Sequence, residues 1–385
     1  SCRPTPETKS KKPFTIPLSL GLVGRSGREL PLRLKGEKKA AGTSRTLAVT
    51  KFKESFTFVD VKEEPVPSLL RGFSAPVRLE HNYSDEQLGF LMACDSDLFT
   101  RFDASQKLGL NQLLRITEDL KAGRFPFVDQ RLIDHGYRSV LIDGSLDMAV
   151  RAEILTLPSP TALLEEMQDY DVALALRARD ILFDAVAKGL EKELASTYSS
   201  LAKSERSRID GSAFAARRLK NTCLAYLTLR SETPETSLAL RHFENAGNMT
   251  DSICALGILA QNDTPERLKA LKTFEKRWKN DGLVMNKWFT VQAASRHNAT
   301  RFAVVSLRKH PSYHADNPNM VRSLEFTFAS NLRHFHAIDG SSYAHVATEI
   351  LRLDAFNPGV AGRLDTFFKK YPRLDDRMAS LAEIQ

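Results

Sequence analysis

The sequence of 385 residues predicts a mainly α-helical protein that begins with a small all-β domain. The expected architecture is an antiparallel β-sandwich followed by an α-solenoid, a superhelical array of helix pairs. Over residues 1–80, short segments rich in Val, Phe and Thr alternate with turn residues, which is typical of antiparallel strands. From Ser84 onward, apolar residues recur with the helical period, in segments joined by short loops. This change predicts two domains, residues 1–81 and 82–385.

The β domain is predicted from several short strands and the turns between them. Turn residues at 24–27 and a charged loop at 35–44 separate neighbouring segments. Several short strands joined by turns in one small region are typical of a sandwich, here one that is expected to lack its first strand. The expected strands are 15–23, 29–34, 46–50, 55–61 and 75–81.

The helical domain begins with a capping box, because the Ser84 hydroxyl can accept a backbone N–H and Gln87 can reach back to Ser84. Further helix starts are expected where a capping residue precedes proline, at Ser159-Pro160, Thr264-Pro265 and Asn317-Pro318. Clear apolar periodicity predicts helices at 85–95, 101–122, 176–202 and 214–230. No strict repeat of about 34 or 40 residues is visible, so the repeat is expected in the structure rather than in the sequence.

The composition excludes several classes of protein. With 42% hydrophobic and 26% charged residues, the chain is not a disordered, collagen-like or disulfide-scaffold protein. Its net charge of +8 originates in residues 1–53, which hold 13 Lys and Arg against 3 Asp and Glu. This segment is either a nucleic-acid surface or a set of edge strands that Lys protects from aggregation. Phe14 and Phe52 are its only aromatic residues, so no nucleic-acid partner is expected.

A membrane partner is not expected either. No run of about 18 apolar residues occurs, and the N-terminus lacks the apolar core of a signal peptide. The four cysteines, Cys2, Cys94, Cys223 and Cys254, lie far apart in the sequence. The last three fall in apolar helical patterns, where buried free thiols are expected. Free thiols favour the cytoplasm or another reducing compartment, such as an organelle stroma or matrix. Because the chain begins with Ser1 rather than Met, we interpret it as a piece of a longer protein.

The sequence contains no catalytic motif. The zinc-hydrolase motif HExxH is absent, since none of the nine histidines is followed by Glu. The phosphate-loop, dinucleotide-binding and hydrolase motifs GxxxxGK[ST], GxGxxG and GxSxG are absent as well. The carboxylate pairs Glu165/Glu166 and Asp375/Asp376 are adjacent on expected helices, so their side chains diverge and a shared acid–base site is not expected.

A group of histidines and aspartates near the C-terminus has two interpretations, a metal site or ordinary loop and capping residues. A metal site would need three or four of these side chains to converge. Pro311 breaks the helix that would align the first two histidines, so no metal ligands are expected in this chain. The group consists of His310, His314, Asp316, His334, His336, Asp339 and His345.

Arg322 and Arg363 are the candidate substrate-cavity residues. Each is expected in the first turns of a helix, where the helix dipole disfavours a cation, so each should have an anionic or carbonyl partner. That partner is either a carboxylate inside the helical stack or a substrate.

Seven strings in one order along residues 13–384 together resemble the C-terminal half of the bacterial-type aminopeptidase N family. These are zinc-dependent, alanine-preferring aminopeptidases of the gluzincin type. The strings are VPSLLRGFSAPVRLEHNYSDEQLGFLMACDSDLFTRFDASQ (66–106), RAEILTLPSP (151–160), RRLKNTCLAYL (217–227), NAGNMTDSICAL (245–256), DGLVMNKWF (281–289), NPNMVRSL (317–324) and FHAIDGSSY (335–343).

The resemblance implies that this chain holds the third and fourth of four domains, a β-sandwich and a helical superhelix. It implies that zinc is bound upstream of this chain, so this chain alone would bind no cofactor and would be inactive. The helical domain would close over the substrate cavity, with Arg322 and Arg363 on the wall facing the carboxylate or carbonyls of a peptide. Departures from the family pattern leave peptide selection open; they lie at Asn286, Ile338, Ser342 and Gly359.

The leading hypothesis is that the chain is the non-catalytic C-terminal part of a zinc aminopeptidase that removes N-terminal amino acids from peptides. Its partners would be peptide substrates and the upstream catalytic domain of the same protein. One alternative is a stand-alone helical-repeat scaffold that binds a peptide or protein. The other is a nucleic-acid binder that uses the basic β segment.

Overall fold

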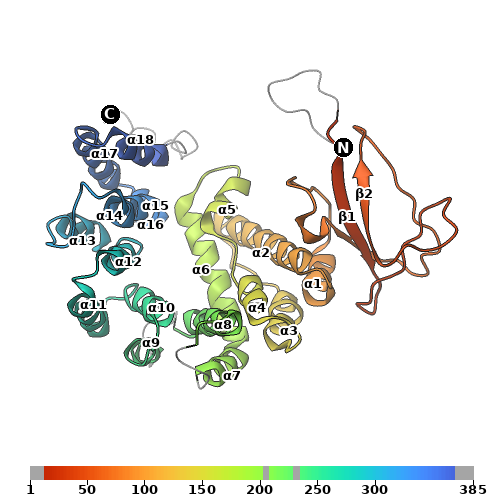
Figure 1. Cartoon of the computed structure of the whole chain (residues 1–385), viewed down its shortest axis with the longest axis horizontal. Coiled ribbons are helices and arrows are strands. Elements are labelled where there is room, and N and C mark those ends of the chain that lie inside the picture. The colour runs from red at the N-terminus through yellow and green to blue at the C-terminus, as the bar shows by residue number, and fades with distance from the viewer. Residues whose placement is uncertain (1–12, 203–207, 229–234, 369–385) are drawn as a thin grey trace. The chain divides into compact units, whose positions relative to one another are not determined.

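The computed structural model describes residues 13–202, 208–228 and 235–368, in which strands come first and helices follow (Figure 1). Packing groups the chain into two compact units. The first contains residues 1–112 and 128–158, and the second contains residues 113–127 and 159–385. The strands and the first helices therefore belong to one compact unit. The predicted domain boundary near residue 82 instead marks the position where strands give way to helices.

The sheet of the first unit has three antiparallel strands, β1 (Ile16–Val23), β2 (Ser44–Val49) and β3 (Val66–Leu69), in the order β2-β1-β3. The second half of the central strand, residues 20–23, is buried, and it includes Leu20 and Leu22. They pack with Leu32 and Leu47 into a small apolar core of this unit. The Leu18–Leu47 pair sets the register between β1 and β2.

Only part of the predicted strand pattern forms regular ladders. Segments 29–34 and 55–61 contribute isolated bridges, because Pro31 lacks an N–H to donate and Asp60 has a positive φ of 60°. The predicted strand 75–81 is not a strand, and 66–69 is one instead. The strand was not predicted because it contains Pro67, and proline is unusual within a strand. Proline is tolerated here because β3 lies at the edge of the sheet.

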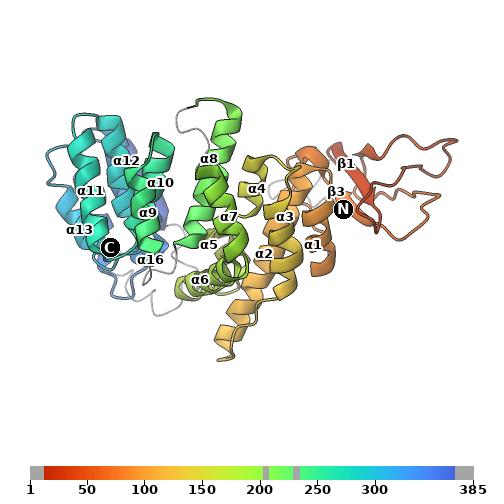
Figure 2. The same cartoon turned by 90° about the horizontal axis from the view of Figure 1, so that it is seen from below.

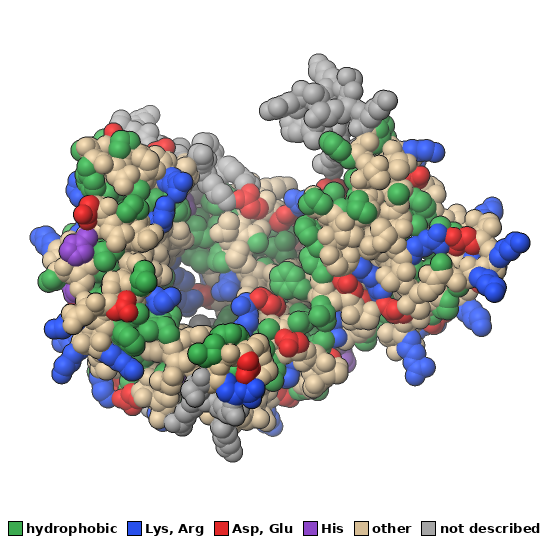
Figure 3. All heavy atoms as spheres, in the orientation of Figure 1, with side chains coloured by type: hydrophobic (Ala, Val, Ile, Leu, Met, Phe, Trp, Pro, Cys, Tyr) green, Lys and Arg blue, Asp and Glu red, His purple; other side chains and the backbone are tan. Residues whose placement is uncertain are grey.

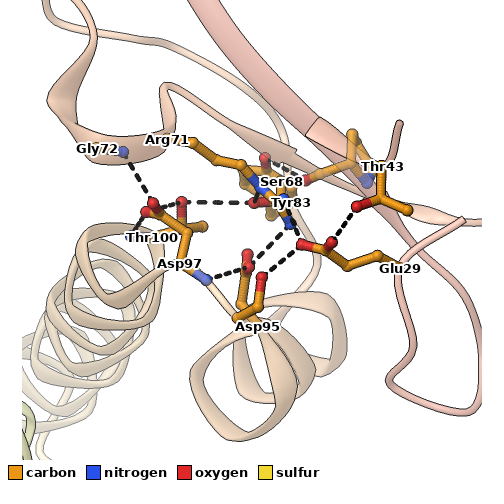
Figure 4. Close-up of polar contacts among 11 residues, drawn as sticks. Glu29, Thr43, Ser68, Arg71, Gly72, Tyr83, Asp95, Asp97 and Thr100 are labelled. Carbon is orange, nitrogen blue, oxygen red and sulfur yellow. Dashed lines mark hydrogen bonds and ion pairs between the residues drawn. The ribbon is translucent and has the colours of Figure 1, made fainter. Parts of the chain in front are cut away.

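A buried arginine connects the strands to the first helices (Figure 4). Arg71, in the short 3-10 helix η1 (Arg71–Phe73), is 6% exposed. Its Nη1 donates to Glu29 Oε1 at 2.5 Å, its Nη2 to Asp95 Oδ1 at 3.0 Å and its Nε to Ser68 Oγ at 2.7 Å. Glu29 also accepts hydrogen bonds from Thr43 and Ser96. One guanidinium group therefore neutralises carboxylates from the β segment and from the end of the first helix.

The first helix begins as the sequence predicts. Ser84 Oγ accepts the Gln87 N–H at 3.2 Å, and Gln87 Oε1 accepts the Ser84 N–H at 3.0 Å, which confirms the capping box. The helices that start in the first unit are α1 (Asp85–Cys94), α2 (Leu98–Lys121), the π-helical η2 (Leu132–Tyr137), α3 (Arg138–Ile142) and α4 (Met148–Ile154). Helix α2 continues from the first unit into the second.

The second unit confirms the other predicted helix starts, because Ser159, Thr264 and Asn317 each accept a backbone N–H in the first turn of their helix. The predicted helix 176–202 is two helices, since the backbone leaves the helical region at Leu190 (φ −112°, ψ 10°). The elements are α5 (Pro160–Glu166), α6 (Val172–Gly189), α7 (Glu191–Ala202), α8 (Gly211–Leu227), α9 (Glu235–Glu244), α10 (Met249–Leu259), α11 (Pro265–Trp278), α12 (Gly282–Ala293), α13 (Thr300–Leu307), α14 (Pro318–Val321), η3 (Arg322–Phe326), α15 (Thr327–Ser330), α16 (Leu332–Phe335), α17 (Ser341–Asp354) and α18 (Pro358–Asp365).

Successive helices of the second unit pack as pairs, among them α7 with α8, α9 with α10 and α17 with α18. Figure 2 shows α9 to α12 close together. One continuous apolar core runs from α9 to α18, and its largest fully buried side chains are Phe274, Phe289, Phe328 and Phe335. The predicted class, a small all-β domain followed by an array of helix pairs, is confirmed. Within the described ranges, no helix is long and apolar enough to cross a bilayer.

Candidate functional site

Arg322 lies on one continuous helical run that combines α14, η3 and α15. The run starts at Pro318 because Asn317 Oδ1 accepts the Asn319 N–H at 3.0 Å. The Arg322 side chain is exposed, and its Nη1 donates to Asn319 Oδ1 at 3.1 Å. The sequence predicted an anionic or carbonyl partner for Arg322. In the structure this partner is the side-chain amide oxygen of Asn319, one turn earlier in the helix.

Arg363 lies in the last turn of the short helix α18, where the helix dipole favours a cation, so the expectation that the dipole disfavours it is wrong. Asn357 Oδ1 accepts the Val360 N–H at 3.3 Å, so this helix also begins with an asparagine cap followed by proline. Val360 and Leu364 are buried, whereas Arg363 is exposed on the opposite side. Among the residues that the structure describes, neither Arg322 nor Arg363 forms an ion pair with a carboxylate.

An aromatic pair brings the two elements that carry these arginines together. Phe326 lies one turn after Arg322, and Phe367 lies one turn after Arg363. The two rings meet edge to face with centroids 5.8 Å apart. Two exposed guanidinium groups, each without a carboxylate partner in the described chain, are thus placed on touching elements. Each of these exposed guanidinium groups can bind an anion or carbonyl oxygens.

A buried ionic network, which sequence reasoning did not identify, lies on the inner side of the η3 turn. Glu325 is fully buried and accepts two hydrogen bonds from Arg308, Nε to Oε1 at 2.7 Å and Nη2 to Oε2 at 3.1 Å. The remaining nitrogen of Arg308, Nη1, lies 3.1 Å from Oε2 of the buried Glu349. His345 Nε2 lies 3.5 Å from Glu325 Oε2, and Arg352 pairs with Glu349.

The network favours the ionised form of the Glu325 carboxylate. Burial alone would raise the pKa of Glu325, but the neighbouring His345 and the hydrogen bonds from Arg308 outweigh burial and lower that pKa below its ordinary value. The pKa of Arg308 is raised, because Glu325 and Glu349 outweigh the effect of burial. Two arginines, Arg308 and Arg352, therefore balance two buried glutamates.

The histidine group singled out in the sequence does not converge. His310 Nε2 lies 3.1 Å from Glu275 Oε1, His345 belongs to the Glu325 network, and His336 Nδ1 lies 2.6 Å from the Tyr343 hydroxyl. Burial lowers the pKa of His336 to about 4. In the part of the chain that the structure describes, no three His, Cys, Asp or Glu side chains lie close enough together to hold a metal ion.

Of the three cysteines predicted to be buried, Cys223 is buried, Cys254 is half-buried and Cys94 is exposed. Cys223 is buried, and burial raises the pKa of the Cys254 thiol to about 12, so both are poor nucleophiles. The prediction that Cys94 is buried is wrong: it is the last residue of α1, whose buried face consists of Leu88, Leu91 and Met92, and its side chain is exposed.

The remaining charged features lie at the surface or outside the described residues. Figure 3 shows Lys and Arg side chains along the loops of the β segment. Some of these cations have local partners, as in the Arg45–Glu37 pair at 2.7 Å. Glu165 and Glu166 are exposed on α5, and the predicted pair Asp375/Asp376 lies outside the described residues. The choice between a nucleic-acid surface and protected edge strands stays a prediction.

One departure from the family pattern lines a cleft of the second unit. Ile338, which is 82% exposed, borders a cleft of about 740 Å³ between α6 and α16. Asp180 of α6 lines the same cleft, and its Oδ2 lies 3.1 Å from Nη2 of Arg333 on α16. At this departure from the family pattern, the wall of the cleft carries an exposed apolar side chain.

Comparisons with known proteins cover almost the whole chain. Residues 1–82 match the domain of unknown function DUF3458, described as an Ig-like fold, and residues 85–385 match DUF3458_C, described as ARM repeats. Aminopeptidase N of Escherichia coli (strain K12) is 35% identical over 361 residues, which are 94% of this chain and 41% of that protein. Aminopeptidase N of Haemophilus influenzae is 31% identical over 382 residues, which are 99% of this chain and 43% of that protein.

A solved structure agrees with these matches. The crystal structure of Legionella pneumophila aminopeptidase A in complex with aspartic acid superimposes with a TM-score of 0.81 at 28% identity, covering 95% of this chain and 42% of that chain. The chain thus spans less than half the length of the relatives that it matches. The chain belongs to the DUF3458 family, an Ig-like domain followed by an ARM-repeat domain, and corresponds to the C-terminal part of an aminopeptidase N.

Proposed function

We propose that this chain is the non-catalytic C-terminal part of a zinc aminopeptidase that removes N-terminal amino acids from peptides, and that it caps and shapes the substrate cavity. The observation that carries the proposal is the match of 94% and 99% of the chain to two proteins named aminopeptidase N. The cysteines that the structure describes are free thiols, which supports the cytoplasm or another reducing compartment.

The residues of this chain would bind and orient the peptide rather than break its bond. The exposed guanidinium groups of Arg322 and Arg363 would receive the C-terminal carboxylate or the backbone carbonyls of the peptide. Arginine suits this task because its planar group stays charged and presents two parallel donors.

The zinc ion would be held by the part of the protein that precedes this chain. The described residues do not fit a zinc ion, because no three potential ligands come together. The partners of this chain in the whole enzyme would be peptide substrates and the upstream catalytic domain.

The test uses the full-length gene product that carries this chain, with trialanine and an alanyl anilide as substrates. Arg322→Met or Arg363→Met should lower kcat/KM for trialanine about 10- to 100-fold, the worth of one hydrogen bond between charged groups. The anilide lacks a C-terminal carboxylate and should be little affected. Arg277→Met, which removes an exposed arginine of α11, is the matched control.

A second measurement uses the 385-residue chain alone. It should hydrolyse neither substrate and should bind no stoichiometric zinc. Hydrolysis of the anilide by the isolated chain with one bound zinc ion would contradict the proposal. A gene that encodes only these residues would favour the alternative function, a helical-repeat scaffold for a peptide or protein.

A further inference from the structure

We infer that Glu325 and Arg308 are positioning residues for Arg322: their buried ion pair holds the π-helical turn η3 and thereby sets the direction of the Arg322 side chain. The part of the inference that concerns substrate binding by Arg322 rests on the proposed function. It concerns residues that touch no substrate themselves, since Glu325 is fully buried.

The first step is the geometry of the turn. In an α-helix, residues three apart are separated by about 60° around the axis, so Arg322 and Glu325 would share a face. In a π turn, where the N–H of residue i+5 bonds to the carbonyl of residue i, the separation grows to roughly 115°. The Thr327 N–H bonds to the Arg322 carbonyl in this way and also to the Leu324 carbonyl. The wider turn lets Glu325 point into the core while Arg322 points out.

The burial pattern of the helical run agrees with this geometry. Buried pairs recur every four residues, at Met320-Val321, Leu324-Glu325 and Phe328-Ala329. An α-helix repeats after 3.6 residues, so a regular helix would rotate these pairs progressively away from the core. The extra residue in the π turn keeps all three pairs on the buried side.

The second step is what selects the π turn. Arg308, at the end of α13, uses Nε and Nη2 on Glu325 and Nη1 on Glu349 of α17, so all three of its nitrogens are occupied. The Glu325 carboxylate can accept both hydrogen bonds from the Arg308 guanidinium group only if the Glu325 side chain points into the core. A regular α-helical turn would rotate the Glu325 carboxylate away from this guanidinium group and leave buried charges unpaired, which is strongly disfavoured.

The third step separates positioning from simple stabilisation. Buried ion pairs are often no more stabilising than apolar residues of similar volume, and in some proteins they specify one arrangement. The double variant Glu325→Leu/Arg308→Met also removes one partner of Glu349, which keeps its pair with Arg352, so this variant should fold at reduced stability and lose the requirement for the π turn. The conservative variant Glu325→Gln keeps the shape of the side chain and removes its charge.

The matched control is Asp251→Asn. Asp251 is 4% exposed and belongs to a separate buried network, in which its Oδ2 accepts from Lys220 Nζ at 2.7 Å and from Asn248 Nδ2 at 2.9 Å. This control measures what the loss of a buried carboxylate does to the helical unit in general.

The first readout is amide hydrogen exchange on the 385-residue chain. Glu325→Gln should speed the exchange of the Phe326 and Thr327 amides about tenfold or more relative to amides of α11, and Asp251→Asn should leave this ratio unchanged. Equal exchange of the Thr327 amide in the wild type, Glu325→Gln and the double variant would overturn the inference.

The second readout is kinetic, on the full-length gene product. Glu325→Gln should raise KM for trialanine about tenfold while KM for the alanyl anilide stays unchanged, and adding Arg322→Met should cause little further loss. Fully additive effects, or the same change of KM in Asp251→Asn, would overturn the inference. If Arg322→Met alone leaves trialanine kinetics unchanged, the proposed function fails and the substrate-positioning role fails with it. The exchange result then still decides whether the ion pair holds the turn.

Discussion

Replacing Arg71 by Met should destabilise the first unit more than any other single change near the β segment. Arg71 is 6% exposed, and its guanidinium group contacts Glu29, Asp95 and Ser68. Methionine fills most of the same volume, so the main effect is the loss of the positive charge. Asp95 is 1% exposed and would then be a buried carboxylate without its cation.

The expected magnitude follows from the burial of Asp95. Burial raises the pKa of Asp95 even with the Ser68 hydrogen bond and Arg71 in place, which shows that its ionised form is already costly. Removing one partner of a buried ion pair typically costs about 3–5 kcal/mol. We expect Arg71→Met to lower the free energy of unfolding of the first unit by this amount, and Arg71→Lys by less.

A substitution at Gly21 tests the same buried position of the Arg71 guanidinium group independently. A Cβ built at Gly21 would lie 2.3 Å from Arg71 Cζ, so Gly21→Ala must displace a guanidinium group that three partners hold. Overpacking of this kind costs roughly 1–3 kcal/mol. In the Arg71→Met background the added methyl group meets a flexible side chain, and its cost should largely disappear.

The assay is amide hydrogen exchange at β1 and α1 during mild urea titration. Both tryptophans, Trp278 and Trp288, belong to the second unit, so their fluorescence reports on that unit and serves as the control. Exchange at β1 should accelerate about 100-fold or more in Arg71→Met while the fluorescence midpoint stays unchanged. A loss below about 1 kcal/mol, or full additivity with Gly21→Ala, would refute the reasoning.

Three further predictions concern pH, thiols and capping. The nearby His242 ring and hydrogen bonds from Lys220 and Asn248 lower the pKa of Asp251 against the effect of burial, so the stabilising effect of Asp251 is complete above about pH 4 and is lost at lower pH. Asp251→Asn should flatten the dependence of Tm on acid pH, and an unchanged slope would contradict this. In a Cys2→Ser variant a thiol reagent should modify the exposed Cys94 faster than Cys254, although burial raises the pKa of both thiols, as mass spectrometry of timed samples can show. Ser84→Ala should cost about 1 kcal/mol in urea unfolding, and no loss would argue against the capping box.

Features fixed by neighbouring residues could be predicted from the sequence. The capping box at Ser84 and the starts at Ser159, Thr264 and Asn317 depend on side chains that reach backbone groups within the same turn. The order of a β domain followed by helices also follows from local periodicity. These predictions succeeded because no distant contact is needed to satisfy them.

Features that depend on distant contacts could not be predicted. The strand 66–69 exists because it pairs with β1, whose partner residues lie more than 40 positions earlier in the chain. The ion pair of Glu325 with Arg308 joins different helices and is invisible to a helical pattern. A signal existed, since Glu325 stands between Leu324 and Phe326 at a position where an apolar residue would be expected.

The most direct test of the central claim is the ratio of kcat/KM for trialanine to that for an alanyl anilide, measured on the full-length gene product with both Arg322→Met and Arg363→Met. The proposed function predicts that the ratio falls at least about tenfold, because only the tripeptide presents a carboxylate and carbonyls to these arginines. An unchanged ratio, in a variant whose melting temperature equals that of the wild type, would contradict the claim that this chain shapes the substrate cavity.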